Sequence, residues 1–206
     1  MLFRVGVLAA LRSKRLDGKT IGVMVTASHN PEQVCDPAMK RCDMCSSYLR
    51  QDNGVKLVDP RGEMLEASWE VYATSVANAP TTADFIEALQ ALISSQKIDL
   101  SRPGRVIYAR DTRPSGPALV AALEDGLKAL NAEARNEGVQ TTPILHYLVR
   151  CINTRGTKDE YGEATVEGYY KKLGEAFKKL VVSKPESCYM PLFHCLFRRA
   201  KSHLNR

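Results

Sequence analysis

The sequence has 206 residues and a formal net charge of +6, with 44% apolar and 25% charged residues. This length suits one domain with a sizeable core, and the composition is ordinary for a soluble protein. No stretch approaches the run of about twenty apolar residues that spans a membrane, and the start shows no secretory signal. We therefore expect a cytoplasmic protein with no membrane partner.

The positive charge is concentrated outside the main part of the sequence. Residues 181–206 carry a net +4 and residues 34–51 a net +1, which leaves +1 for the remainder. Nucleic-acid binding needs basic side chains gathered on one face of a fold. A nearly neutral core with a basic end therefore argues against a nucleic-acid partner.

Cysteine is distributed as unevenly as the charge. The six cysteines fall into three groups: Cys35, Cys42 and Cys45; Cys151; and Cys188 and Cys195. A secreted disulfide framework would not cluster in this way, so reduced thiols are expected. The first group has partly zinc-like spacing but no evident fourth ligand, whereas structural zinc sites have four. We therefore expect residues 34–51 to be an unfolded surface insert without zinc.

The first half of the chain predicts one helix and two strands. Apolar residues at helical spacing predict a buried helix over residues 2–11. The apolar run at residues 21–25 predicts a strand covered on both faces, as in parallel sheets. Residues 54–58 alternate as a second strand, with Lys56 on the solvent side, and a turn follows at residues 59–62.

The second half alternates predicted helices with a third strand at residues 105–109. Pro117 is typical of a helix start, and Thr142 is a candidate N-cap for the next helix. The predicted helices cover residues 68–79, 83–93 and 117–130, a segment opened by Thr142-Pro143, and residues 166–181. Strands that alternate with helices predict an α/β fold, with a layered mixed sheet flanked by helices.

The segment Thr26-Ala27-Ser28-His29-Asn30-Pro31 directly follows the predicted strand at residues 21–25. Open α/β sheets bind ligands at the carboxyl ends of their strands. Ser28 offers a hydroxyl that can carry a covalent group, while His29 and Asn30 can hydrogen-bond to a phosphate or to neighbouring backbone. Spacing alone does not distinguish such a site from an ordinary polar turn.

As a string, this segment resembles the active-serine loop of the α-D-phosphohexomutases. Further stretches match in family order and are similar to the branch that acts on N-acetylglucosamine phosphate: residues 3–14, 52–60, 110–115, 141–143 and 164–170. The resemblance covers about residues 3–33 and 52–180. It implies the first domain of a phosphohexomutase over residues 1–180, interrupted by the insert at 34–51 and followed by an unstructured tail at 181–206.

The resemblance also implies a reaction. Ser28 would be a phosphoserine that exchanges its phosphoryl group with a hexosamine phosphate substrate, with His29 and Asn30 beside it. The net reaction would interconvert N-acetylglucosamine 6-phosphate and 1-phosphate for nucleotide-sugar synthesis. Ser28 would also be a ligand of the Mg²⁺ cofactor, and no obligate protein partner is implied.

Four further residues are expected to support the site. Lys56 would lie near the transferred phosphate, and Arg110 and Arg113 would neutralise phosphate charge with bidentate forks. Asp111 would hold one of these arginines in place. The alternative for residues 110–113 is an ordinary salt-bridged turn.

The family pattern is incomplete in this sequence. It shows no Asp-x-Asp-x-Asp run for magnesium, no sugar-binding loop and no distal phosphate-binding loop, and an earlier family strand with its Gly-rich turn has no match. Magnesium needs hard oxygen ligands, which that run would supply. We therefore expect this chain to be inactive as a mutase by itself. The alternative function is a non-catalytic module that holds a phosphate or a partner.

Overall fold

The computed structural model describes residues 1–26 and 54–182, and the chain divides into two units, Met1–Ala164 and Thr165–Arg206. The described part of the second unit contains helix α7 (Val166–Val182). The first unit contains, in chain order, α1 (Leu2–Arg15), β1 (Thr20–Val25), β2 (Val55–Val58), α3 (Ala67–Asn78), α4 (Thr82–Ser95), β3 (Gly104–Arg110), α5 (Gly116–Ala129), β4 (Ala132–Val139) and α6 (Thr142–Thr154).

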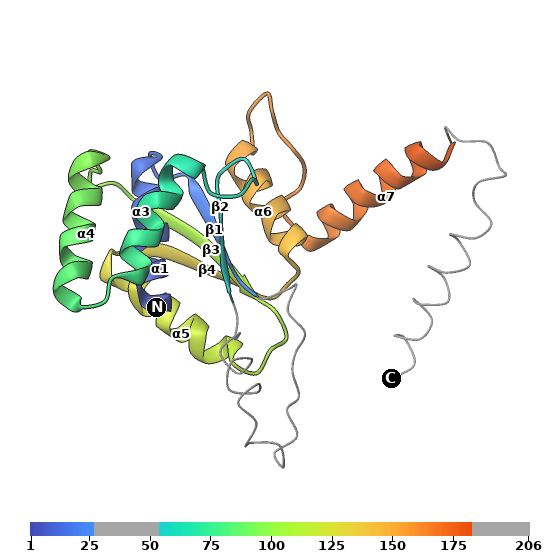
Figure 1. Ribbon diagram of the computed structural model, residues 1–206. Helices are drawn as coiled ribbons and strands as arrows, with labels where there is room; N and C mark the ends of the chain where they lie inside the picture. Colours follow the sequence, from blue (N-terminus) through green and yellow to red (C-terminus); the bar gives the residue numbers. More distant parts are fainter. Residues whose placement is uncertain (27–53, 183–206) are drawn as a thin grey trace, which may run out of the picture. The chain divides into compact units, whose positions relative to one another are not determined.

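The first unit is built on a mixed sheet with the strand order β2-β1-β3-β4. The β1–β3 and β3–β4 pairs are parallel, whereas β2 runs antiparallel to β1. Figure 1 shows α1 and α5 on one face of the sheet and α6 on the other, with α3 and α4 outside α1. This arrangement confirms the predicted layered α/β fold. It also explains why every residue of β1 is buried, since helices cover both of its faces.

The fourth strand is not predicted by the sequence pattern. Strand β4 reads Ala-Glu-Ala-Arg-Asn-Glu-Gly-Val and is largely exposed along its whole length. Because both of its faces meet water, it lacks the apolar alternation that marks a half-buried strand. Its main-chain pairing with β3 holds it in the sheet, and the charged side chains on this edge strand disfavour pairing with another chain.

The expected N-cap of α6 is wrong by one residue. Thr142 is the first helical residue, and Thr141 precedes it at the N-cap position. The side chain of Thr141 makes no capping hydrogen bond. Pro143 lies in the first turn, where its missing amide donor is tolerated. Within the described ranges, no helix combines the length and the apolarity needed to cross a membrane.

Helices α1 and α5 contact each other through their backbones. A Cβ atom on Gly6 would lie 2.3 Å from the carbonyl oxygen of Leu123, and one on Gly126 would lie 2.0 Å from that of Phe3. No side chain fits at either distance, so both positions require glycine. The close approach lets Val120, Leu123 and Leu127 of α5 join the core that α1 forms with β1 and β3.

A buried ion pair fixes the far end of β2. The guanidinium of Arg12 donates to both carboxylate oxygens of Asp59, at 2.9 and 2.7 Å, and to Glu66 at 3.1 Å. Burial alone would lower the pKa of Arg12, but its hydrogen bonds and charge pairing with Asp59 and Glu66 raise it. The guanidinium also lies 4.9 Å from the ring centroid of Trp69. These contacts join α1, the turn after β2 and α3.

We predict that Gly126→Ala destabilises the first unit by about 3 kcal/mol, because the added methyl group would force α1 and α5 apart. The measurement is chemical denaturation followed by circular dichroism. The matched control is Gly174→Ala in α7, where a Cβ would meet nothing within 4 Å. That control should stay within about 1 kcal/mol of the parent, and equal effects of the two substitutions would contradict the close-packing argument.

Candidate functional site

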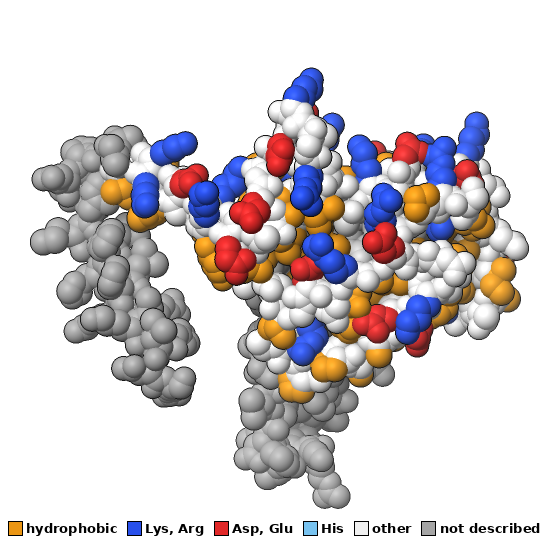
Figure 2. All heavy atoms as spheres, turned by 180° about the vertical axis from the view of Figure 1, so that it is seen from behind, with side chains coloured by type: hydrophobic (Ala, Val, Ile, Leu, Met, Phe, Trp, Pro, Cys, Tyr) orange, Lys and Arg blue, Asp and Glu red, His pale blue; other side chains and the backbone are white. Residues whose placement is uncertain are grey.

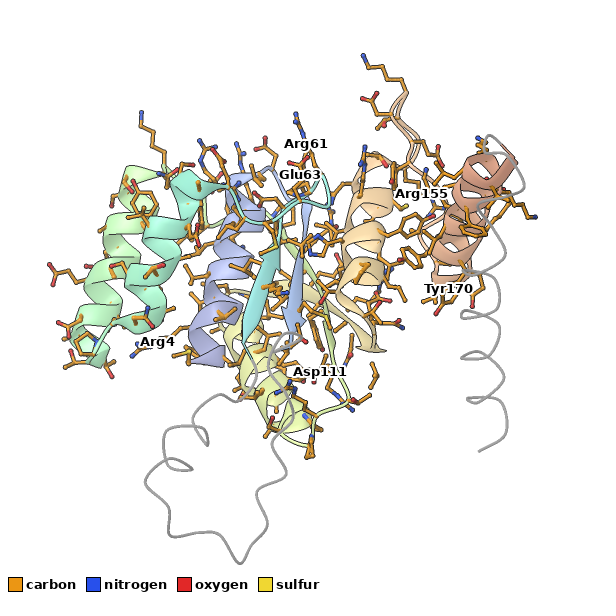
Figure 3. The ribbon with its side chains drawn as sticks, turned by 45° about the vertical axis from the view of Figure 1, so that its right-hand side comes forward. Arg4, Arg61, Glu63, Asp111, Arg155 and Tyr170 are labelled. Atoms are coloured by element: carbon orange, nitrogen blue, oxygen red, sulfur yellow. The ribbon has the colours of Figure 1, made fainter. Side chains whose placement is uncertain are left out.

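Strand register brings three strand ends to one edge of the sheet. Val25, the last residue of β1, pairs with Arg110 at the end of β3 and with Val55 at the start of β2. The amide of Asp111 then donates to the carbonyl of Val25 at 3.1 Å, which extends the pairing by one step. Figure 3 shows Asp111 at this edge and Arg61 and Glu63 at the opposite one.

Ser28, His29 and Asn30 lie outside the described residues. The two residues that flank their segment are described, and they meet at this edge: the amide of Thr26 donates to the carbonyl of Gly54 at 3.0 Å. The connection from β1 to β2 therefore leaves the sheet and returns to it at one point, next to Asp111.

Asp111 is the centre of the hydrogen bonding at this edge. Its Oδ2 accepts from the hydroxyl of Thr26 at 3.0 Å and lies 3.2 Å from Nε of Arg113. Its Oδ1 accepts from the amide of Arg113 at 3.1 Å, and its carbonyl oxygen accepts from Nη1 of Arg110 at 3.0 Å. Every polar atom of Asp111 thus has a partner, which makes its position strongly determined.

Arg110 and Arg113 occupy different surroundings. The side chain of Arg113 is only 15% exposed and is paired with Asp111. The Arg110 side chain crosses the start of α5, where a Cβ on Gly116 would lie 2.9 Å from its Cδ atom. The glycine at the first position of α5 therefore leaves room for the Arg110 side chain. Both arginines are held at the edge by the main chain or the carboxylate of Asp111.

Lys56 lies on β2, paired with Met24 of β1, one residue from the edge. It is also one of the residues that line a groove of about 280 Å³ between β2, α1 and α3, together with Val5 and Glu70. The described residues therefore bring together Thr26, Arg110, Asp111 and Arg113, while Lys56 approaches the same edge from the neighbouring strand.

The described part of this edge suits an anion better than a cation. Two arginines lie here, and the one carboxylate between them is already shared among three donors. Across residues 1–26 and 54–182, no cluster of three His, Cys, Asp or Glu side chains is placed to hold a metal ion. Ser28, which is the magnesium ligand expected from the sequence, lies outside these ranges. The described residues alone therefore do not form a Mg²⁺ site.

Thr26 is a site residue for which the sequence patterns suggest no role. The residue is 3% exposed, and its hydroxyl donates to Asp111, which directly follows β3. One feature of the sequence could have indicated this role. Threonine is β-branched, which suits a strand, and it also carries a hydrogen-bonding hydroxyl at the point where the strand ends. Sequence spacing could not reveal its partner, because Asp111 is distant in the chain.

Matches to protein families and to individual proteins identify the relatives of this chain. Residues 72–158 match the model described as phosphoglucomutase/phosphomannomutase, alpha/beta/alpha domain I. The chain is 44% identical to phosphoacetylglucosamine mutase of Candida albicans and 47% identical to that of Sus scrofa, over 86% and 91% of its length. Over most of its length the chain is homologous to the α-D-phosphohexomutases. It spans about 30% of the length of these two relatives.

Solved structures agree with this placement in the phosphohexomutase family. An Aspergillus fumigatus N-acetylphosphoglucosamine mutase variant, in complex with glucose 1,6-bisphosphate, is 49% identical with a TM-score of 0.73. The Aspergillus fumigatus enzyme in complex with GlcNAc-6P and magnesium is 50% identical with a TM-score of 0.70. Both matches cover 86% of this chain and 29% of the other chain. This chain therefore corresponds to domain I of the phosphohexomutase fold.

We predict that Asp111→Ala lowers the free energy of unfolding by about 2 kcal/mol, because it leaves the Thr26 hydroxyl and the largely buried Arg113 without their shared acceptor. Urea denaturation measures the change. Asp125→Ala is the control, since Asp125 forms an exposed pair with Lys128 on α5; it should change stability by less than about 0.5 kcal/mol. A loss no larger than that of the control would show that Asp111 does not organise this edge.

Proposed function

We propose that this chain is the phosphoserine-bearing first domain of a phosphoacetylglucosamine mutase. The observation that carries the proposal is the edge centred on Asp111, where two anchored arginines stand beside the point at which the Ser28 segment leaves the sheet. A phosphorylated serine and a sugar phosphate both present anions, which guanidinium groups can neutralise with planar pairs of hydrogen bonds. Residues 110–113 thus form a salt-bridged turn that also supplies positive charge to the site.

In the proposed reaction, Ser28 donates its phosphoryl group to the free hydroxyl of a hexosamine monophosphate. The resulting sugar bisphosphate turns over and returns its other phosphoryl group to Ser28. Arg110 and Arg113 balance the charge of the transferring group, and His29 and Asn30 flank the serine. Fixed charges and alignment supply most of the rate enhancement in such transfers.

The structure of one relative extends the proposal to ligands. The Aspergillus fumigatus enzyme binds GlcNAc-6P and magnesium, and we infer the same substrate class and cofactor for the complete enzyme to which this domain would belong. When bound, magnesium would supply positive charge that offsets the charge of the transferring phosphoryl group. The oxygen of Ser28 is the ligand this chain offers, and the other ligands would come from outside the described residues.

The proposal also covers chain organisation and partners. We infer that the domain covers residues 1–180 with an insert at residues 34–51, and that residues 181–206 lie outside it, in a cytoplasmic protein with no nucleic-acid partner. Figure 2 supports the last point for the face it shows: acidic and basic side chains of the described residues are interspersed there. A nucleic-acid footprint would gather the basic ones.

A second candidate function is a non-catalytic module that binds a phosphate without turning over a substrate. The observation that favours it is coverage, because the chain spans about 30% of the relatives it matches. The two candidates differ in whether catalysis requires the part of the relatives that this chain does not match.

We predict that the 206-residue chain shows no mutase activity. Without distal groups to bind and align the sugar, roughly 7 to 11 kcal/mol of transition-state stabilisation is missing. A coupled assay for N-acetylglucosamine 1-phosphate, with magnesium and a sugar bisphosphate primer, tests the chain and a version that lacks residues 34–51. Both should be silent. A Ser28-dependent rate above background from either would show that the first domain is self-sufficient.

We predict that a chimera regains activity through Ser28. The matching stretch of the Candida albicans relative is replaced by this chain without residues 34–51, and the same assay is applied. Ser28→Ala should lower turnover at least about a thousandfold, or about 4 kcal/mol, and should abolish phosphate on that peptide in mass spectrometry. Ser101→Ala, at an exposed serine, is the control. Near-normal turnover of the Ser28→Ala chimera would remove the proposed phosphoryl carrier.

A further inference from the structure

We propose that Thr26 is a positioning residue, whose buried hydroxyl acts through Asp111 to orient the guanidinium of Arg113 at the carboxyl edge of the sheet. Its consequence for phosphoryl transfer rests on the function proposed above, whereas the orientation itself does not. No motif or comparison assigns this role to Thr26.

The contact chain is direct and lies within one unit. The hydroxyl of Thr26 donates to Oδ2 of Asp111 at 3.0 Å, and the same oxygen lies 3.2 Å from Nε of Arg113. The side chains of Asp111 and Arg113 are 21% and 15% exposed, and Thr26 is 3% exposed. Water therefore has limited access to compete for these bonds, so each bond is stronger than its surface equivalent.

A hydroxyl at position 26 is a specific choice rather than a packing requirement. Valine has the same shape as threonine and suits a buried strand end, as Val25 shows by being fully buried next to it. Burying a hydroxyl costs free energy unless it is hydrogen-bonded. The bond to Asp111 offsets that cost, and in return it fixes where Oδ2 points.

The link is not needed to hold the two strand ends together. That task is already performed by the main chain, because the amide of Asp111 donates to the carbonyl of Val25 and β1 pairs with β3 along its length. What the side chain of Thr26 adds is a constraint on rotation of the Asp111 carboxylate. The carboxylate in turn sets the direction of the planar Arg113 guanidinium, whose hydrogen bonds depend on that plane.

The orientation matters for the proposed reaction because a misplaced charge stabilises a transferring phosphoryl group poorly. A shift of about 1 Å in a positioning group can cost about a hundredfold in rate. The effect of Thr26 would pass through Asp111 and Arg113, which its hydroxyl contacts directly or through one carboxylate. The segment that carries Ser28 begins directly after Thr26 in the sequence.

The test compares three variants in the full 206-residue chain: Thr26→Val, which removes the hydroxyl; Thr26→Ser, which keeps it; and Thr20→Val. Thr20 is the matched control, because it is a buried threonine at the other end of β1 whose bonds to Asn153 come from its main chain. Two quantities are measured. The first is the hydrogen-exchange rate of the Arg113 Nε–H by NMR in this chain, and the second is the turnover of the Candida albicans chimera carrying the same substitutions, in the coupled assay with magnesium and a sugar bisphosphate primer.

Thr26→Val should accelerate Arg113 Nε–H exchange at least about tenfold and lower the turnover of the chimera at least about tenfold, with a melting-temperature change no larger than that of Thr20→Val. Thr26→Ser should restore both rates to within about threefold. If Thr26→Val leaves Arg113 exchange unchanged, or if Thr20→Val changes it equally, the inference is overturned.

The two proposals fail in different ways. If the parent chimera shows no turnover, the proposed function fails, and the Arg113 exchange rates in the 206-residue chain still decide whether Thr26 orients the arginine. If the parent chimera and its Thr26→Val variant turn over equally fast, the positioning role is wrong while the proposed function stands.

Discussion

The parallel pairing of β1 with β3 sets Val25 opposite Arg110, and the candidate site depends on that register. Side chains alternate along a strand, so a slip of one residue would turn each of these positions to the other face of the sheet. The burial of β1 on both faces and the glycine contacts between α1 and α5 leave little freedom for such a slip. Packing far from the edge thereby determines which side chains meet there.

The edge owes its chemical character to Asp111. A carboxylate between two arginines could have been a metal ligand, but its oxygens are occupied by a hydroxyl, an amide and a guanidinium. The Asp111 carboxylate therefore acts within the protein, and a ligand at this edge would meet positive charge.

Burial also changes the pKa of a group on β3. It raises the pKa of Tyr108, and the hydrogen bond to Glu124 adds to that shift. This tyrosine stays neutral at physiological pH.

The sequence predicts most of this fold because local signals and tertiary packing agree. The apolar run at residues 21–25 and the helical spacing in α1 and α5 each match a buried face. Strand β4 escapes prediction because most of its residues are exposed and it lacks an alternating apolar face, although Ala132 packs against the core. The Ser28 string and the arginines could be selected by resemblance, whereas the role of Thr26 needs a contact between two strands that no local pattern encodes.

The hydrogen bond from Thr26 to Gly54 closes the β1–β2 connection at its base. Closure entropy grows only with the logarithm of segment length, so a threefold longer connection at this point costs about 1 kcal/mol more. An antiparallel pair sealed in this way can accept extra sequence without loss of register. An engineered guest, such as an epitope tag or a fluorescent reporter, could therefore be joined to the fold through Thr26 and Gly54, next to Asp111.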